Sequence, residues 1–231
     1  MTNSALTATL DVPFECGFLK AGAMNGLPTY PVPPITTLQG LLYNALGRPS
    51  LLKPNNLSKE VRDNEEDFRE RVQTNCRFGI RVVDAGDRTT GLRSRQKAIN
   101  KSEMSYVTYV ARMETIIAPT YRVYIGGPDD LLTAFESGLE NPQRPLSLGR
   151  SDDLVEVSDI EVVPITEQDR TAEVDCVVPG AENDPVLLPV APDYRGRYTE
   201  HPGELKTVSV SGGTVDSYFE TDSGERFVYV T

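Results

Sequence analysis

Apolar and polar residues alternate with a period of two in several short stretches of the chain. Residues 6–14 do so loosely, and residues 78–83, 105–110 and 121–125 do so clearly. This period is typical of β-strands that bury one face. The pattern therefore predicts at least four strands in the first two thirds of the chain.

Two other stretches place apolar residues at helical spacing. In residues 36–46 a threonine at 36 or 37 can cap the helix and Gly47 can end it. The second begins after Pro128, a residue suited to a first helical turn, and carries one apolar face. Residues 58–73 are strongly charged with few apolar anchors, which predicts a surface helix.

The order of these elements predicts the fold class. Strand, helix, strand, projecting segment, strand and helix follow one another, and residues 145–148 are expected to supply a fourth strand. This is the β-α-β-β-α-β order of an α+β, ferredoxin-like (RRM-like) domain. We expect one antiparallel sheet with two helices on a single face and the other face free.

The remainder of the chain is rich in short β-like runs without a helix. Turn-forming residues separate these runs. The sequence thus predicts a ferredoxin-like domain over residues 1–152 and a small antiparallel β unit over residues 153–231. The expected strands of the second unit are residues 154–157, 161–163, 172–178, 186–190, 207–210 and 227–230.

Composition excludes several kinds of protein. The 231 residues contain no run of eighteen apolar residues and no signal-like start, so we expect a cytoplasmic protein without a membrane span. The three cysteines lie far apart in the sequence and are predicted to be buried apolar residues in a reducing compartment. With a single histidine, neither a metal site nor a cofactor is predicted.

Charge is distributed unevenly. The net charge of −11 argues against nucleic acid, yet residues 69–101 hold nine basic and three acidic residues. Residues 140–231 hold 19 acidic and 7 basic residues. The acidic excess is explained equally by ordinary solubility or by a halophilic source, since six lysines stand against seventeen arginines.

Two segments are predicted to contact RNA. A basic finger can neutralise phosphates and stack on bases, and a glycine turn at residues 149–151 can offer backbone N–H groups to a phosphate. The alternatives are a solvated loop that balances nearby acids and an ordinary turn. The predicted RNA-binding residues are Lys20, Arg88, Arg93, Arg95, Lys97, Lys101, Gly149, Arg150 and Ser151.

Catalytic residues are not predicted. No phosphate-cradling glycine motif is present, and a catalytic triad could only use His201, in a Pro/Gly loop. The adjacent pair Asp129 and Asp130 suits the first turn of a helix. Adjacent acids such as Asp152 and Asp153 are expected by chance in so acidic a chain.

Two motifs together resemble one family. Residues 30–34, Tyr-Pro-Val-Pro-Pro, run into Thr-Leu-Gln-Gly-Leu at 37–41, and this resembles the N-terminal signature of the CRISPR-associated protein five family. Residues 145–153 resemble the second signature of that family, about 110 residues later, and residues 76–81 resemble its second strand. The resemblance covers roughly residues 5–165.

The resemblance implies a function. It implies a member of the RAMP superfamily, with a β-hairpin thumb at about residues 87–113, that binds the 5′ handle of crRNA at the foot of a type I Cascade complex. Implied partners are crRNA, the Cascade backbone and large subunits and, through the complex, target DNA. The acidic balance favours type I-B, and in a halophile Tyr30, Tyr106 and Tyr109 would contribute stacking.

Two alternatives to this RNA-binding role remain. Some members of the family cut precursor crRNA with Tyr, Lys and His side chains, whereas His201 lies outside the matched region. We therefore expect a non-catalytic subunit, with a metal-independent endoribonuclease that processes precursor crRNA as the alternative. A third possibility is a subunit that only caps an assembly through protein contacts.

Overall fold

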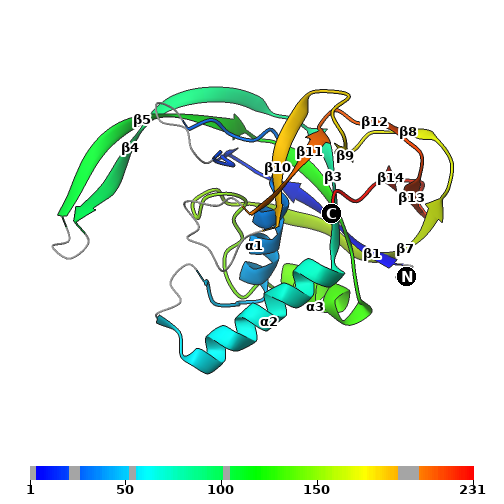
Figure 1. Ribbon diagram of the computed structural model, residues 1–231, viewed down its shortest axis with the longest axis horizontal. Coiled ribbons are helices and arrows are strands. Elements are labelled where there is room, and N and C mark those ends of the chain that lie inside the picture. Colours follow the sequence, from blue (N-terminus) through cyan, green and yellow to red (C-terminus); the bar gives the residue numbers. More distant parts are fainter. Residues whose placement is uncertain (1–3, 21–26, 52–55, 101–104, 192–202) are drawn as a thin grey trace.

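A six-stranded antiparallel sheet forms the centre of the molecule (Figure 1). The computed structural model describes residues 4–20, 27–51, 56–100, 105–191 and 203–231, without the side chains of 95–100, 105–107 and 109. The strands lie in the order β14 (Arg226–Phe227), β13 (Tyr218–Thr221), β7 (Glu156–Gln168), β1 (Ser4–Asp11), β6 (Thr120–Gly126) and β3 (Arg77–Asp84). The fold is thus mixed, with mostly antiparallel sheets and few helices.

One face of this sheet packs against two helices. Leu6, Ala8 and Leu10 alternate along β1 and are fully buried in the main core with apolar residues of α1 (Ile35–Ala45) and α3 (Asp129–Glu140). The period-two and helical patterns are therefore complementary, since each element buries its apolar face against the other.

The helices begin close to the predicted positions. α1 starts at Ile35, and its N-cap is Pro34, without a side-chain cap hydrogen bond. The predicted cap at Thr36 or Thr37 is therefore wrong, because both threonines lie within the first turn of the helix. Gly47 follows α1 with a φ of 68°, as predicted. α3 starts directly after Pro128. α2 (Lys59–Asn75) has Ser58 as its N-cap, and the Ser58 hydroxyl accepts a hydrogen bond from the amide of Val61 at 3.3 Å.

The predicted hairpin is confirmed. β4 (Asp87–Asn100) and β5 (Ser105–Ile117) pair in register from Asp87 opposite Ile117, and β2 (Glu15–Cys16) pairs with the base of β5. Figure 1 shows β4 and β5 extending away from the rest of the molecule. The hairpin therefore offers surface that the main core does not cover.

The predicted fourth strand at residues 145–148 is wrong. This segment forms only an isolated bridge between Ser147 and Leu154, although Leu146 and Leu148 are buried. Besides β6, the strand that pairs with β1 is β7, which joins two stretches predicted as separate short strands. A register shift near Asp159, with a φ of 49°, interrupts the alternation of β7. This interruption explains why the sequence predicted two short strands in place of one.

The second face of the sheet is not free, contrary to the expectation. Phe227 stacks on Tyr124 with ring centroids 4.1 Å apart, and both lie in a second buried cluster. A Cβ at Gly79 would lie 2.7 Å from the carbonyl oxygen of Val228. The glycine thus permits the C-terminal residues to pack directly on the sheet.

The remaining strands form two small sheets. Their order is β10 (Pro185–Ala191), β11 (Glu204–Ser209) and β9 (Val178–Pro179) in one, and β12 (Gly213–Val215) and β8 (Ala172–Val174) in the other. The division at residue 152 stays a prediction; β7, β13 and β14, from beyond it, belong to the central sheet. No helix in the described part of the chain is long and apolar enough to cross a membrane.

Candidate nucleic-acid interface

Four of the basic residues predicted to contact RNA fall on one strand of the hairpin. In β4, Arg88 lies opposite Ile116 and Arg93 opposite Ala111, while Arg95 and Lys97 pair with Tyr109 and Val107. Positions 93, 95 and 97 alternate, so they belong to the same face of the strand. Lys101 lies outside the described residues.

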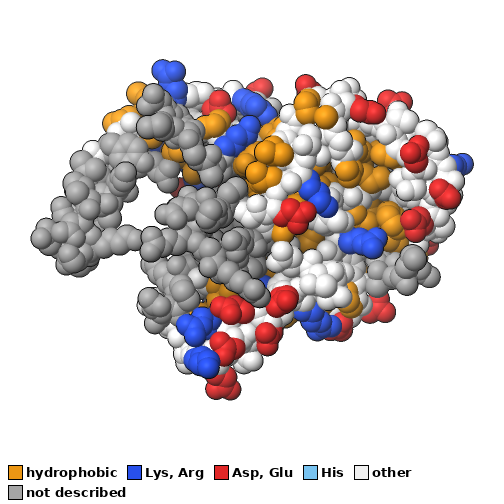
Figure 2. All heavy atoms as spheres, in the orientation of Figure 1, with side chains coloured by type: hydrophobic (Ala, Val, Ile, Leu, Met, Phe, Trp, Pro, Cys, Tyr) orange, Lys and Arg blue, Asp and Glu red, His pale blue; other side chains and the backbone are white. Residues whose placement is uncertain are grey.

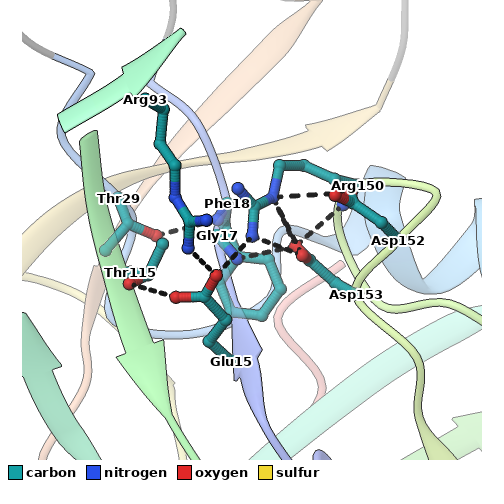
Figure 3. A network of polar contacts seen from close by, with 9 residues as sticks. All are labelled: Glu15, Gly17, Phe18, Thr29, Arg93, Thr115, Arg150, Asp152 and Asp153. Atoms are coloured by element: carbon teal, nitrogen blue, oxygen red, sulfur yellow. Dashed lines mark hydrogen bonds and ion pairs between the residues drawn. The ribbon is translucent and has the colours of Figure 1, made fainter. Parts of the chain in front are cut away.

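At the base of the hairpin, Glu15 of β2 joins two of the predicted RNA-binding arginines (Figure 3). Its carboxylate pairs with Arg93 and lies 3.8 Å from the guanidinium of Arg150. Thr115 of β5 donates a hydrogen bond to the same carboxylate at 3.0 Å. Glu15 is thus the centre of a polar network that the sequence did not predict.

Arg150 forms an ion pair with Asp153. Its Nε lies 2.9 Å from each carboxylate oxygen of Asp153, whose side chain is only 2% exposed. The same carboxylate accepts hydrogen bonds from the backbone amides of Gly17 at 2.9 Å and Arg150 at 3.1 Å. Asp153 therefore closes the turn that Gly149 begins and fastens it to the chain after β2.

The other predicted site residues lie around this network. Gly149 has a φ of 114°, and a Cβ there would lie 2.9 Å from the carbonyl oxygen of Gly17. Ser151 is exposed in the same turn. Lys20 lies with its Nζ 5.2 Å from the ring centroid of Tyr30, a cation–π contact.

The network changes which arginines are available to a ligand. Arg93 and Arg150 already have carboxylate partners, whereas Arg88 and Arg112 are exposed and form no ion pair within the described residues. Arg112 was missed because it lies on β5, beyond the basic cluster. The predicted hairpin itself was the available signal, because its register brings Arg112 opposite Leu92 on β4.

Arg112 borders a hollow on one side of the hairpin. This open cavity of about 730 Å³ is lined by Leu27, Pro28, Thr90, Gly91, Leu92, Arg112 and Glu114. Leu92 is 73% exposed there, while Glu114 accepts a hydrogen bond from the amide of Thr29 at 3.1 Å. The surface thus combines a cation with exposed apolar area.

The two sequence signatures meet through residues 17 and 18. The amide of Tyr30 donates to the carbonyl of Phe18 at 2.8 Å, and the amide of Phe18 donates to the hydroxyl of Thr29 at 2.8 Å. Gly17, the next residue back, donates to Asp153. Motifs separated by more than 100 residues therefore support one site.

Comparison with protein families identifies the chain. Residues 22–208 match the family described as "CRISPR-associated protein (Cas_Cas5)". The chain belongs to this Cas5 family. The match extends beyond residue 165, so the Cas5 region includes much of the acidic segment for which the signatures had shown no resemblance.

Solved structures support the same fold for this Cas5 chain. A chain of a "CRISPR RNA-guided surveillance complex" aligns with a TM-score of 0.52 and 14% identity, covering 95% of this chain and 92% of the other. A CRISPR protein from Archaeoglobus fulgidus aligns with a TM-score of 0.52 and 14% identity, covering 98% and 100%. No curated protein matches the sequence.

Cys16, Cys76 and the half-buried Tyr30 of the Cas5 chain are poor general bases. Burial, reinforced by the negative charge of Asp153 and opposed by Arg150, raises the pKa of Cys16 to about 12. Burial also raises the pKa of Cys76 to about 12 and that of Tyr30 above its ordinary value. These groups stay protonated at neutral pH, and no cluster of metal ligands occurs in the described segments.

Proposed function

We propose that this Cas5 chain is a non-catalytic subunit of a type I CRISPR Cascade surveillance complex that binds the 5′ handle of crRNA and caps the complex. The observation that carries the proposal is the β4–β5 hairpin, a projecting, basic element within a chain of this family. Its proposed partners are crRNA, the backbone and large subunits and, through the complex, target DNA.

The hairpin supports RNA binding through exposed cations. Arg88 and Arg112 are available at its base, and Arg95 and Lys97 follow along β4. Cations along a strand can contact successive phosphates, and each neutralised phosphate releases bound counterions. Arg93 and Arg150 contribute by holding the hairpin to the turn through Glu15. We thus assign contact to the first group and positioning to the second.

We also propose that the central region is a ferredoxin-like (RRM-like) domain. The support is the order β7-β1-β6-β3 with antiparallel neighbours. This order arises when two β-α-β units share a sheet. In this interpretation β7 replaces residues 145–148 as the fourth strand.

RNA binding by the hairpin is tested by reversing the charge of two of its basic residues. We expect Arg95→Glu with Lys97→Glu to abolish retention of crRNA by the purified complex, because reversed charges repel phosphates. The matched control is Lys59→Glu with Arg62→Glu on α2, which changes the net charge equally. Retention of crRNA at the wild-type ratio by the hairpin variant would show that the hairpin is not the binding element.

The absence of catalysis is tested separately. We expect the pure chain to leave repeat RNA intact in the presence of EDTA, because RNA cleavage needs a base for the 2′-hydroxyl and an acid for the leaving oxygen. A single cut that disappears in His201→Ala would establish the endoribonuclease alternative. His201, which lies outside the described residues, is not one of the residues of β4 or β5, so this test changes no hairpin residue.

A further inference from the structure

A second cavity lies between α2 and the sheet that contains β10 and β11. It has a volume of about 700 Å³. It is lined by Gln39, Glu66, Asp67, Glu70, Gln73, Thr74, Cys76, Phe78, Val190, Ala191, Glu204, Lys206 and Thr231. We call it the α2 cleft. None of the residues proposed to contact RNA lines it.

The α2 cleft is strongly acidic. Glu66, Asp67 and Glu70 from α2 and Glu204 from β11 line it, and Lys206 is the one cation among the described lining residues. Figure 2 shows acidic side chains gathered over α2. These four carboxylates have no ion pair within the described residues, and Lys206 is directed to the carbonyl of Val230, with Nζ 3.4 Å from its oxygen. Among the described residues, the negative charge of the cleft therefore lacks a matching set of cations.

Gln39 adds an unused hydrogen-bond acceptor. It lies on α1, is only 2% exposed and lines the α2 cleft. Its Oε1 is buried without a hydrogen-bond partner within the described part of the chain. A buried polar atom is nearly always paired, so an unpaired one that borders a cavity points to a donor supplied from outside. Carboxylates and an amide oxygen both accept hydrogen bonds from a cation.

The remaining lining suits the stem of a long side chain. Cys76, Phe78, Val190 and Ala191 are buried apolar residues along the same cavity. Burial raises the pKa of Cys76 to about 12, so its thiol stays neutral. Lysine and arginine bury their methylene groups against apolar surface while their charged end meets polar groups. The cleft offers both environments within one cavity.

We propose that the α2 cleft binds a lysine or arginine side chain from a basic segment of a second protein. This goes beyond crRNA binding and does not depend on it. An RNA ligand is disfavoured, because four carboxylates would repel phosphates. Complementary charge across an interface mainly sets orientation and association rate. The cleft would therefore fix how the partner docks.

The test uses the purified full chain and a fluorescein-labelled peptide of three Lys-Arg-Gly repeats. We expect fluorescence anisotropy to show binding that weakens about tenfold or more when the cleft carboxylates are neutralised. The cleft variant is Glu66→Gln, Asp67→Asn, Glu70→Gln and Glu204→Gln. The control variant, Glu60→Gln, Glu140→Gln, Glu167→Gln and Glu173→Gln, has the same net charge and should bind like the wild type.

A second variant and a cross-linking measurement locate the peptide. Gln39→Leu should weaken binding several-fold without lowering the thermal midpoint, because it removes a carboxamide whose oxygen is unpaired in the free chain. Carbodiimide joins carboxylates to lysines, so mass spectrometry should find peptide cross-links concentrated at the four cleft carboxylates. Equal weakening in the cleft and control variants, or cross-links spread over all acids, would overturn the proposal.

Another occupant gives a distinct result. Arg195 and Arg197 are cations of this chain itself that lie outside the described residues. If the wild type bound no peptide and Arg195→Ala with Arg197→Ala restored binding, the cleft would belong to this chain's own residues. That outcome would also overturn the proposal of a second protein.

Discussion

At the scale of single residues, Glu15 and Asp153 organise the base of the hairpin. Glu15 lies between two cations, Arg93 and Arg150, whereas Asp153 meets one cation, Arg150, and two backbone amides. Asp153 is 2% exposed, so its charge depends on these partners for stabilisation. The residues predicted to touch RNA are therefore supported by acids that were not predicted.

Asp153→Asn tests this support. We expect it to lower the free energy of unfolding by about 2–3 kcal/mol, because it leaves Arg150, with a side chain 20% exposed, without its charged partner. Asp152→Asn, at a side chain 79% exposed, should change stability by less than about 0.5 kcal/mol. Urea unfolding measures both, and equal stabilities would contradict a structural role for Asp153.

At the scale of elements, α2 depends on polar contacts for its attachment. Val72 is its one fully buried apolar residue, as the charged pattern of residues 58–73 predicted. Glu65, 5% exposed, pairs with Arg48 at 2.5 Å, and the Arg48 guanidinium lies 3.5 Å from the ring centroid of Phe68. Arg69 also donates to the carbonyl of Pro49 at 2.8 Å. A buried charge pair thus joins α2 to the segment after α1.

Removal of that charge should loosen α2 selectively. We expect Glu65→Gln to cost about 2 kcal/mol, less than for a fully buried pair because the Arg48 side chain is 30% exposed. Hydrogen exchange should accelerate in α2 before it does in β1 or β6. Glu66→Gln, an exposed neighbour on the same helix, is the control. Uniform acceleration through the chain would show that α2 does not unfold as a separate element.

At the scale of the whole molecule, the net negative charge must coexist with the RNA binding that we propose. The net charge is −11, yet the hairpin bears exposed arginines. Acidic residues that surround the α2 cleft repel one another and repel nucleic acid. Separation of the basic hairpin from the acidic cleft allows one chain to present two surfaces of opposite charge.

Salt should therefore stabilise the chain. We expect the thermal midpoint to rise between about 0.1 and 1 M KCl, because the screening length falls from about 10 to 3 Å and acid–acid repulsion weakens. The variant with four neutralised cleft carboxylates should show a smaller rise. A midpoint that is constant or falls with KCl would mean that acidic repulsion does not limit stability, and would argue against a halophilic adaptation.

The sequence by itself determined the local structure of this protein. Apolar spacing, Pro128 and Gly47 determined where α1 and α3 lie, and alternation with a basic middle segment determined the β4–β5 hairpin. These features follow from interactions between residues close in the sequence. The spacing of apolar residues and the capping residues therefore predict them directly. Local motifs of the same kind supported the resemblance to the family to which the chain belongs.

Only the tertiary structure decided which distant residues meet. The position of β7 beside β1, the cover of Phe227 over Tyr124, and the link from Gly17 to Asp153 all join residues more than 100 apart. The spacing of apolar residues does not predict such contacts, because they form only when separate elements pack into one core. They determine that Arg93 and Arg150 support the hairpin, while Arg112 is presented at its surface.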